Sequence, residues 1–306
     1  MKPIPRHQRG IAPQSIIAVL FGDYWFGRPE PIPSAALVDM LDIFGISENG
    51  ARAAIQRLAQ RKFLVSHREG RRTAYAVHTS GKKNLAFLIQ RLFQSHLPQD
   101  WDGTWTILTY GTSELPIGDA RLIREELKEL AFGRLNDSLW IKPGHHNNQI
   151  AKSLQNLPPD LAEGVTYFEN ATLSSSTPLS RLRQAFDAES FDLRCHEFTN
   201  FWNEQARAVL GASPSEDEAL RLRTRVMSEW RALIRDNPKL PAEMMPSPAA
   251  IQTAAETCAQ LYDTLGDLAS LKVRTIIQEH DPSLANLVTY HTFKGAETLI
   301  HQVLEQ

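Results

Sequence analysis

The segment from Ser47 to Val77 restricts the possible folds of this chain more than any other. Its first half has the apolar spacing of a helix. Three residues are predicted to form the buried side of this helix: Ala51, Ile55 and Leu58. Ser47 stands where it can cap the free N–H groups of this helix. Two strand-like stretches follow, Phe63–His67 and Thr73–Val77, and Gly70 between them is typical of a tight hairpin. A helix followed at once by a hairpin is compatible with few folds.

Two further helices are predicted in front of this segment. The first covers Ser15–Tyr24, and the second starts after Pro33, where Ser34 can act as its cap. Gly45 ends the second helix, so a turn of about three residues joins it to the helix that Ser47 caps. Two helices joined in this way form a helix-turn-helix, and a hairpin directly behind them is a wing. Residues 1–80 are therefore predicted to be a winged helix-turn-helix domain.

Side chains suited to reading DNA occupy the outer face of the third helix. They recur at intervals of three or four residues and form one polar stripe: Asn49, Arg52, Gln56 and Gln60. Arginine and the two amide side chains pair with guanine and adenine edges in the major groove. Four more arginines are expected beside the phosphate backbone, one on the helix and three on the hairpin: Arg57, Arg68, Arg71 and Arg72. A polar stripe is also what an ordinary solvated helix face presents, and a winged helix can bind protein instead of DNA.

The charge distribution supports a polyanionic partner for the first domain alone. Residues 1–95 carry 14 Lys or Arg and 6 Asp or Glu, whereas residues 96–306 carry 19 and 29. A basic first third on an acidic remainder is expected when only the first domain meets nucleic acid. The two cysteines, Cys195 and Cys258, are too few for a disulfide framework or a zinc cluster. With no export signal and no apolar run of the roughly 20 residues that span a membrane, a cytoplasmic protein is expected.

A linker helix is predicted over residues 81–98, followed by a small domain at residues 99–172. Strands and helices alternate in this domain, in the order Trp105–Tyr110, Asp119–Phe132, Leu139–Ile141, Asn148–Leu157 and Gly164–Phe168. This alternation fits a ferredoxin-like α+β sandwich. His145 and His146 could bind a metal ion, but no carboxylate or cysteine cluster stands beside them, so a plain loop is the better interpretation. The chain has no P-loop, GxSxG or Rossmann glycine pattern, and no catalytic residue, cofactor or metal is expected.

Residues 178–306 are predicted to form a helical domain. Its aromatic residues include Phe191, Phe198, Phe201 and Trp202, and a long amphipathic segment covers Glu218–Ile234. The final helices are predicted over Ala249–His280 and Leu284–Gln306. This composition is compatible with a ligand pocket and with a plain core. The predicted fold class is thus a multidomain α+β protein, with a winged helix-turn-helix, a ferredoxin-like centre and a helical C-terminal domain.

Short motifs in all three predicted domains follow one another in the order found in a known family. They are Leu20–Tyr24, Ala51–Leu58, Glu69–Tyr75, Trp101–Trp105, Leu139–Pro143, Glu229–Arg231 and Arg235–Pro241. Through them almost the whole chain resembles the repressor family of phenylacetic acid degradation operons (PaaX). The resemblance implies a homodimeric repressor of a catabolic operon that binds double-stranded operator DNA. It also implies release of the operator when an aryl-CoA thioester, such as phenylacetyl-CoA, binds.

The resemblance further suggests where the effector binds. Trp230, Arg231 and Arg235 in the third-domain motif are expected near it, because arginines suit the phosphates of CoA. A role of this motif in packing the domain is the alternative. The sequence departs from the family at Ala249 and Ala250, where a tryptophan-proline-glycine is usual, and this leaves the acyl group of the effector open.

A nuclease is the enzymatic alternative. The family's central domain resembles the small nuclease of CRISPR adaptation modules, which carries an acidic residue at the end of its first strand. The corresponding stretch here, Thr109–Thr112, has no carboxylate. A metal-dependent nuclease of this chain would therefore have to use other acidic residues, such as Asp102 or Asp119.

Overall fold

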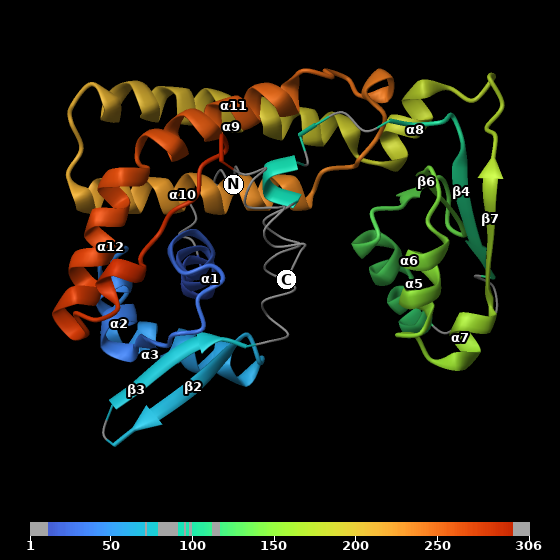
Figure 1. The fold of residues 1–306 in the computed structure, drawn as a ribbon. Coiled ribbons are helices and arrows are strands. Elements are labelled where there is room, and N and C mark those ends of the chain that lie inside the picture. Colours follow the sequence, from blue (N-terminus) through green and yellow to red (C-terminus); the bar gives the residue numbers. More distant parts are fainter. Residues whose placement is uncertain are drawn as a thin grey trace, which may run out of the picture. The chain divides into compact units, whose positions relative to one another are not determined.

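A computed structural model describes residues 12–70, 72–78, 91–94, 96–97, 100–111 and 117–295 of the chain. Their contacts divide the chain into two compact units. The first unit comprises residues 1–96, 198–234 and 253–306, and the second comprises residues 97–197 and 235–252. The first unit thus contains both the N-terminal elements and most of the C-terminal helices (Figure 1).

The N-terminal elements follow one another in the order expected for a winged helix-turn-helix. They are α1 (Pro13–Tyr24), β1 (Ile32–Pro33), α2 (Ser34–Asp42), α3 (Glu48–Gln60), β2 (Leu64–Glu69) and β3 (Arg72–Val77). The strands form an antiparallel sheet in the order β1-β3-β2. Strand β1 was not expected from the sequence, because only two residues, one of them proline, make its pairing with β3.

Local interactions define the ends of these elements. The Ser47 hydroxyl accepts a hydrogen bond from the Gly50 N–H, at 3.3 Å, and so caps α3 as expected. Gly45 and Gly70 both have positive φ, +73° and +59°, which glycine adopts without steric cost in these two turns. The expected cap at Ser34 was wrong: Ser34 is the first residue of α2, and no side chain caps that helix.

The returning strand of the hairpin also differs from its expected pattern. The alternation of a strand predicts that Tyr75 and Val77 face inward, but Ala76 and Val77 are both buried and Tyr75 is half-buried. Ala76 and Val77 lie opposite Val65 and Leu64 of β2, at the end of the hairpin where α2 packs against β3 and α3 packs against β2.

Helix α1 is buried on all sides rather than along one stripe. Eight of its twelve residues are buried: Ile16, Ile17, Val19, Leu20, Phe21, Gly22, Asp23 and Tyr24. A helix that is apolar all round must be covered on every side. Helices α2 and α3 contact it within the N-terminal elements, and residues of the C-terminal helices line a pocket beside it.

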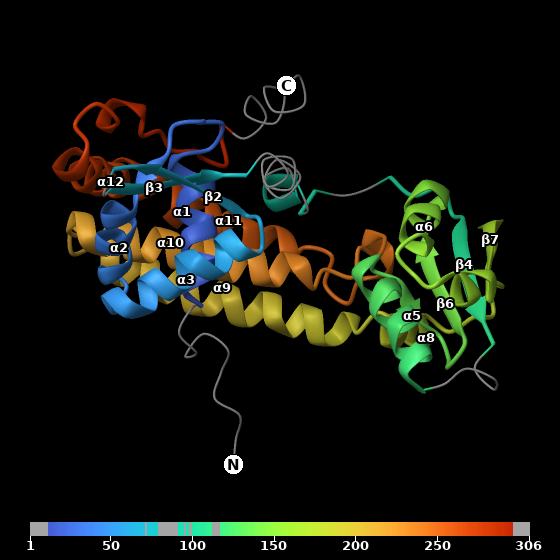
Figure 2. The same ribbon diagram turned by 90° about the horizontal axis from the view of Figure 1, so that it is seen from below.

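The C-terminal part of the chain is helical, as expected. Its long helices are α9 (Ala188–Leu210), α10 (Glu216–Arg235), α11 (Ala250–Thr264) and α12 (Gly266–His280). Helix α12 packs against α2 and β1, and His280 of α12 lies 2.5 Å from the carboxylate of Asp39 on α2. Figure 2 shows α2 beside α12 and α1 beside α10 from a second direction.

The helix expected over Leu284–Gln306 was wrong for the part that the structure describes. Only a short 3-10 turn forms there, Ala285–Leu287, and the chain then continues without regular structure to Gly295. Its backbone bonds to other elements instead: the Thr289 N–H donates to the Tyr24 carbonyl at 3.3 Å, and the Phe293 N–H donates to the Asp263 carboxylate at 2.8 Å. Residues 296–306 lie outside the described residues.

The second unit contains the expected ferredoxin-like domain. Its elements are β4 (Trp105–Tyr110), α5 (Ile117–Glu129), β5 (Gly133–Arg134), β6 (Leu139–Pro143), α6 (Asn147–Leu154), α7 (Pro159–Glu163) and β7 (Val165–Ala171). The four strands are antiparallel in the order β5-β6-β4-β7. The first and third strands of the domain are therefore central, as in the βαββαβ arrangement of ferredoxin-like folds.

Both faces of this sheet are covered. Helices α5, α6 and α7 pack on one face through a core that includes Leu108, Ile123, Leu127, Trp140 and Ile150. Helix α8 (Leu179–Ala185) packs on the other face, where Leu182 and Phe186 meet Trp105. Gly133 allows this packing, because a Cβ atom there would lie 2.4 Å from the Phe186 ring.

None of the helices in the described part of the chain is long and apolar enough to span a membrane. Of the linker helix predicted over residues 81–98, the structure describes a helical piece at residues 91–94; residues 79–90 lie outside the described residues.

Candidate functional site

The polar stripe of α3 is presented to solvent. All of its members are exposed, as is the flanking arginine: Asn49, Arg52, Gln56, Gln60 and Arg57. The opposite side of the helix is buried: Ala51, Ala54, Ile55 and Leu58. The face that sequence reasoning selected for contact with DNA is therefore free for contact, and the helix is anchored through its other side.

Arg52 forms an ion pair along this stripe that the sequence reasoning missed. Its Nε and Nη2 atoms donate to Oε1 of Glu48, at 2.9 and 2.7 Å. Both side chains are more than half exposed, and such i,i+4 pairs are worth about 0.3–0.5 kcal/mol. The four-residue spacing was the signal that could have revealed it. Arg52 must leave Glu48 to reach a base, at a small cost.

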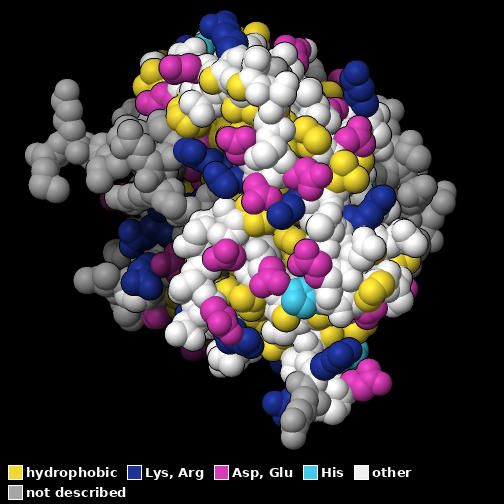
Figure 3. Space-filling model, turned by 90° about the vertical axis from the view of Figure 1, so that its left-hand side faces the viewer, with side chains coloured by type: hydrophobic (Ala, Val, Ile, Leu, Met, Phe, Trp, Pro, Cys, Tyr) yellow, Lys and Arg dark blue, Asp and Glu magenta, His cyan; other side chains and the backbone are white. Residues whose placement is uncertain are grey.

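The hairpin places two of the three expected arginines in adjacent residue pairs near its turn, on opposite faces of the sheet. Arg68 lies opposite Thr73, and the next pair joins Glu69 to Arg72. Arg68 and Arg72 are exposed, whereas Arg71 lies outside the described residues. Basic side chains lie around the end of the hairpin at the bottom of Figure 3, where an acidic side chain is also visible. Acidic and basic side chains are interspersed over the rest of that face.

The structure separates the three residues expected near the effector. Trp230 is fully buried, donates through Nε1 to the Leu92 carbonyl at 2.9 Å, and packs with Phe198 and Phe293. Arg235, the last residue of α10, is exposed and lies 3.6 Å from Asp236. Arg231 lines a pocket beside α1.

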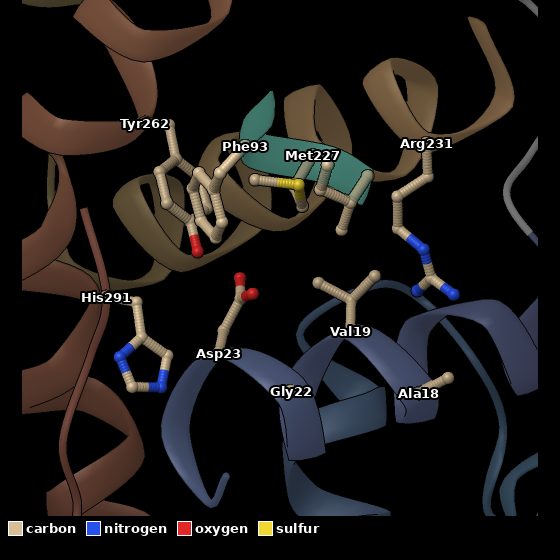
Figure 4. Close-up of a pocket in the computed structure, with 10 residues that line it drawn as sticks. Ala18, Val19, Gly22, Asp23, Phe93, Met227, Arg231, Tyr262 and His291 are labelled. Atoms are coloured by element: carbon tan, nitrogen blue, oxygen red, sulfur yellow. The ribbon is translucent and has the colours of Figure 1, made fainter. Parts of the chain in front are cut away.

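This pocket lies between α1 and the C-terminal helices and has a volume of about 20 Å³, room for about one water molecule (Figure 4). Its lining comes from α1, the helical piece at residues 91–94, α10, α11 and the C-terminal segment: Ala18, Val19, Gly22, Asp23, Leu92, Phe93, Met227, Arg231, Tyr262 and His291. Figure 4 shows the Asp23 carboxylate directed toward Tyr262, while the Arg231 guanidinium lies on the far side of Val19. The lining is thus mainly apolar, with charged groups at its ends.

A buried arginine binds the walls of this pocket together. Arg223 on α10 is 0% exposed and donates to the backbone carbonyls of Tyr262 and His291. Its guanidinium lies 3.7 Å from the centre of the Tyr262 ring and 3.4 Å from the Asp23 carboxylate. From its position on α10, the Arg223 guanidinium therefore contacts α1, α11 and the C-terminal segment.

Burial dominates the electrostatics of the pocket. Burial raises the pKa of Asp23, and the nearby Arg223 opposes that rise. Burial, reinforced by Arg223, lowers the pKa of His291 to about 4. The His291 imidazole is therefore neutral at pH 7, and its buried Nε2 atom has no hydrogen-bond partner among the described residues. No sequence signal joined Asp23 to Arg223, because 200 residues separate them.

The acidic residues of the nuclease alternative lie at opposite ends of β4. Asp102 precedes that strand, whereas Asp119 follows it, in the first turn of α5. His145 and His146 also diverge: His145 lies 2.9 Å from Asp102, and the His146 Nε2 atom bonds to the Pro143 carbonyl at 2.7 Å. Among the residues that the structure describes, no three His, Cys, Asp or Glu side chains are grouped to hold a metal ion.

Comparison with known proteins identifies relatives over most of the chain. Three family models match it in order: PaaX-like protein at residues 12–81, PaaX protein central Cas2-like domain at residues 98–181, and PaaX-like protein C-terminal domain at residues 186–274. The transcriptional repressor PaaX of Escherichia coli (strain K12) is 23% identical over 261 residues, which cover 83% of this chain and 81% of the repressor.

A solved structure has a similar fold. The uncharacterized protein Rv0674 from Mycobacterium tuberculosis aligns with a TM-score of 0.53 and 18% sequence identity, covering 85% of this chain and 98% of that protein. At this identity the likeness shows the shared fold alone.

Proposed function

The chain belongs to the PaaX-like family, and from this premise we propose that it is a transcriptional repressor that binds operator DNA through a winged helix-turn-helix at residues 1–80. The observation that carries the proposal is the exposed stripe of α3, because its side chains are those that recognise guanine and adenine in the major groove. The relative named a transcriptional repressor supports the same role.

In this proposal the stripe of α3 and the arginines around it contact different parts of the DNA. Asn49, Arg52, Gln56 and Gln60 read bases, and the remaining arginines contact phosphates: Arg57, Arg68, Arg71 and Arg72. A homodimer places its two copies of α3 about 34 Å apart, one turn of the duplex, so the operator is an inverted repeat. The ion pair between Arg52 and Glu48 opens when Arg52 binds a base.

The effector in this proposal is an aryl-CoA thioester such as phenylacetyl-CoA, and the repressed operon is catabolic. We place its binding at the pocket beside α1, where Arg231 can bind a CoA phosphate and Val19, Phe93 and Met227 offer apolar contacts. The exposed Arg235 is a second candidate for a phosphate, while Trp230 supports the site from the core.

This position explains how an effector can release DNA. Helix α1 lines the pocket and also packs against α3. The pocket as it stands is small for a thioester, so a ligand that enters it must move α1 away from α10 or α11. An effector shifts the equilibrium only if it binds the two states differently, and a pocket that is closed in one state meets that condition.

The test is binding of the purified protein to its own upstream intergenic DNA at fixed salt, with and without phenylacetyl-CoA. Specific binding that the thioester relieves supports the repressor and its effector together. Specific binding that ignores phenylacetyl-CoA retains the repressor and redirects the search to other acyl-CoA thioesters. Absence of specific binding overturns the proposal and favours a protein-binding adaptor or, if DNA is cleaved in the presence of a divalent metal, a nuclease.

A further inference from the structure

A second, larger cavity lies wholly within the second unit, where three distant segments meet. Its volume is about 410 Å³, which falls within the range of small-molecule sites, roughly 300–1,000 Å³. One wall precedes β4, another follows β6, and the third follows α10: Asp100, Trp101, Asp102, Pro143, Gly144, His145, Lys239, Leu240 and Pro241. The residues of all three walls belong to the short motifs by which the sequence resembles its family, or lie next to these motifs. None of the wall residues has a part in repression as proposed above.

Hydrogen bonds hold two of these walls rigidly together. The Gly144 N–H donates to the Thr104 carbonyl at 2.9 Å, and the Thr106 hydroxyl donates to the Gly144 carbonyl at 2.6 Å. The Trp101 ring is fixed through its Nε1 atom, which donates to the Thr104 carbonyl at 2.7 Å. A site whose walls are already in place loses little entropy when a ligand binds.

Hydrogen bonds stabilise the ionised form of one carboxylate of the cavity, that of Asp102. The backbone N–H and the hydroxyl of Thr104 both donate to Oδ1 of Asp102, at 2.9 and 2.7 Å, and lower the pKa of Asp102 to about 2. Its Oδ2 atom lies 2.9 Å from His145. Thr104 thus binds Oδ1, and Oδ2, beside His145, can also accept a hydrogen bond from a ligand.

The third wall contributes a positive charge on a strained backbone. Lys239 has a φ of +53°, a conformation that costs a residue with a side chain of the order of 1 kcal/mol. The Asn237 side chain stabilises it by accepting a hydrogen bond from the Lys239 N–H at 2.9 Å. Such strain is found most often at ligand sites and other functional positions, where it fixes the direction of a side chain.

The charges of the lining select the class of ligand. Asp100 and Asp102 supply two negative charges and Lys239 one positive charge, so a polyanion such as CoA is disfavoured here. A cation alone would meet Lys239, and an anion alone would meet the two carboxylates. The indole of Trp101 and the prolines Pro143 and Pro241 also line the cavity and offer flat apolar surfaces.

We propose that this cavity binds a small zwitterionic aromatic or cyclic compound, whose ammonium group lies against Asp100 and Asp102 and whose carboxylate lies against Lys239. Its lining shares no residue with α3 or with the pocket at Arg231. Its occupation can therefore be measured on the full chain without DNA or thioester.

Three probes that share one ring test the proposal: 4-(aminomethyl)benzoate, benzylamine and benzoate, titrated into the full-length protein by calorimetry at pH 7. We expect saturable binding of 4-(aminomethyl)benzoate, at least tenfold tighter than that of either singly charged probe. Equal affinities for the three probes overturn the proposal. So does preference for benzoate, which indicates an anion site, or for benzylamine, which indicates a cation site.

Matched variants show whether binding occurs in this cavity. Asp102→Asn and Lys239→Gln should each weaken 4-(aminomethyl)benzoate at least tenfold, and Lys239→Gln should leave benzylamine unchanged or improve it. Asp160→Asn and Lys128→Gln alter exposed charges elsewhere in the same unit and should change nothing. Binding that survives both cavity variants places the ligand elsewhere and overturns the assignment. Asparagine can still accept the bonds from Thr104, and an unchanged melting temperature verifies that the loop is intact.

Discussion

The guanidinium of Arg223, on α10, lies 3.4 Å from the carboxylate of Asp23, on α1, and neither side chain is more than 10% exposed. This pair joins the helix beside the proposed DNA-reading elements to the C-terminal helices. Buried ion pairs add little stability over an apolar pair, but removing one partner leaves an uncompensated charge in the interior. The pair therefore makes the two parts of the first unit depend on each other.

Replacement of this arginine should be severe. Arg223→Met should lower the free energy of unfolding by about 3–5 kcal/mol, since Asp23 and two backbone carbonyls lose their partner. Urea unfolding followed by circular dichroism measures the change. The double variant Asp23→Leu/Arg223→Met should recover part of the loss. If the double variant is as unstable as the sum of the two single variants, the pair is not coupled.

Arg52 should contribute specificity as well as affinity. Arg52→Ala should weaken operator binding by about 1–3 kcal/mol and relax the base preference at one position of each half-site. Arg121→Ala is the matched control, because Arg121 forms an equivalent exposed i,i+4 pair with Glu125 on α5. Mobility shifts against a library of single-base operator variants measure both effects. Uniform weakening across the library would assign Arg52 to the phosphates.

Glu48 should restrain the free protein. Glu48→Gln releases Arg52 and removes a negative charge from the surface that approaches the phosphates, so operator binding should tighten, by severalfold at low salt. Fluorescence anisotropy at several salt concentrations measures this gain, which should shrink as salt is raised. A loss of affinity would show that Glu48 itself contacts a base.

Arg72 should act without regard to sequence. Arg72→Ala is expected to weaken operator and random DNA alike and to reduce the slope of log K against log salt by about 0.9, the amount for one phosphate contact. Salt titrations on both duplexes measure the slope. An unchanged slope would remove the hairpin from the interface.

Arg231 should separate effector response from DNA affinity. Arg231→Ala is expected to raise the concentration of phenylacetyl-CoA that releases the operator by tenfold or more, with operator affinity in its absence within about twofold of the parent. Arg207→Ala, an exposed arginine of α9, is the control. Equal responses of the two variants would exclude the pocket at Arg231 as the effector site.

His291 should make stability depend on pH. Its pKa in the folded protein is about 4, below the ordinary 6.5, so the unfolded chain binds more protons between these values. The free energy of unfolding should therefore fall as the pH is lowered from about 6.5 to 4, by at most about 3 kcal/mol. The raised pKa of Asp23 makes the free energy of unfolding change with pH in the opposite direction. Asp23 is present in both the parent and the His291→Gln variant, so its contribution cancels when their profiles are compared. His291→Gln should flatten this part of the profile, whereas His67→Gln, at an exposed histidine, should not.

Elements with a strong local signal could be predicted from the sequence. The strand at Trp105–Tyr110 was predicted to the residue, because its apolar and β-branched run is bounded by turn residues. The cap at Ser47 and the turns at Gly45 and Gly70 were found for the same reason: each depends on a few neighbouring residues.

Features that depend on distant residues could not be predicted. The pairing of Ile32 with Tyr75 has no pattern of its own, and the C-terminal segment after Leu284 was assigned to a helix because its bonds to Tyr24 and Asp263 are invisible in sequence. Trp230 was assigned to an effector site by its motif, and the structure places it in the core. The stripe of α3 was identified correctly as an exposed face, and its role remains a prediction.

Helix α1 is buried on all sides, and part of its cover comes from α10, α11 and the segment around His291. If the N-terminal elements bind DNA as proposed, they could therefore not be grafted alone onto another protein. A chimaera that exchanged DNA specificity between relatives would have to transfer Arg223, Tyr262 and His291 along with α1, or alter α3 alone. Operator preference should accordingly differ among relatives through substitutions on the exposed face of α3. The residues that pack α1 against the C-terminal helices should change together.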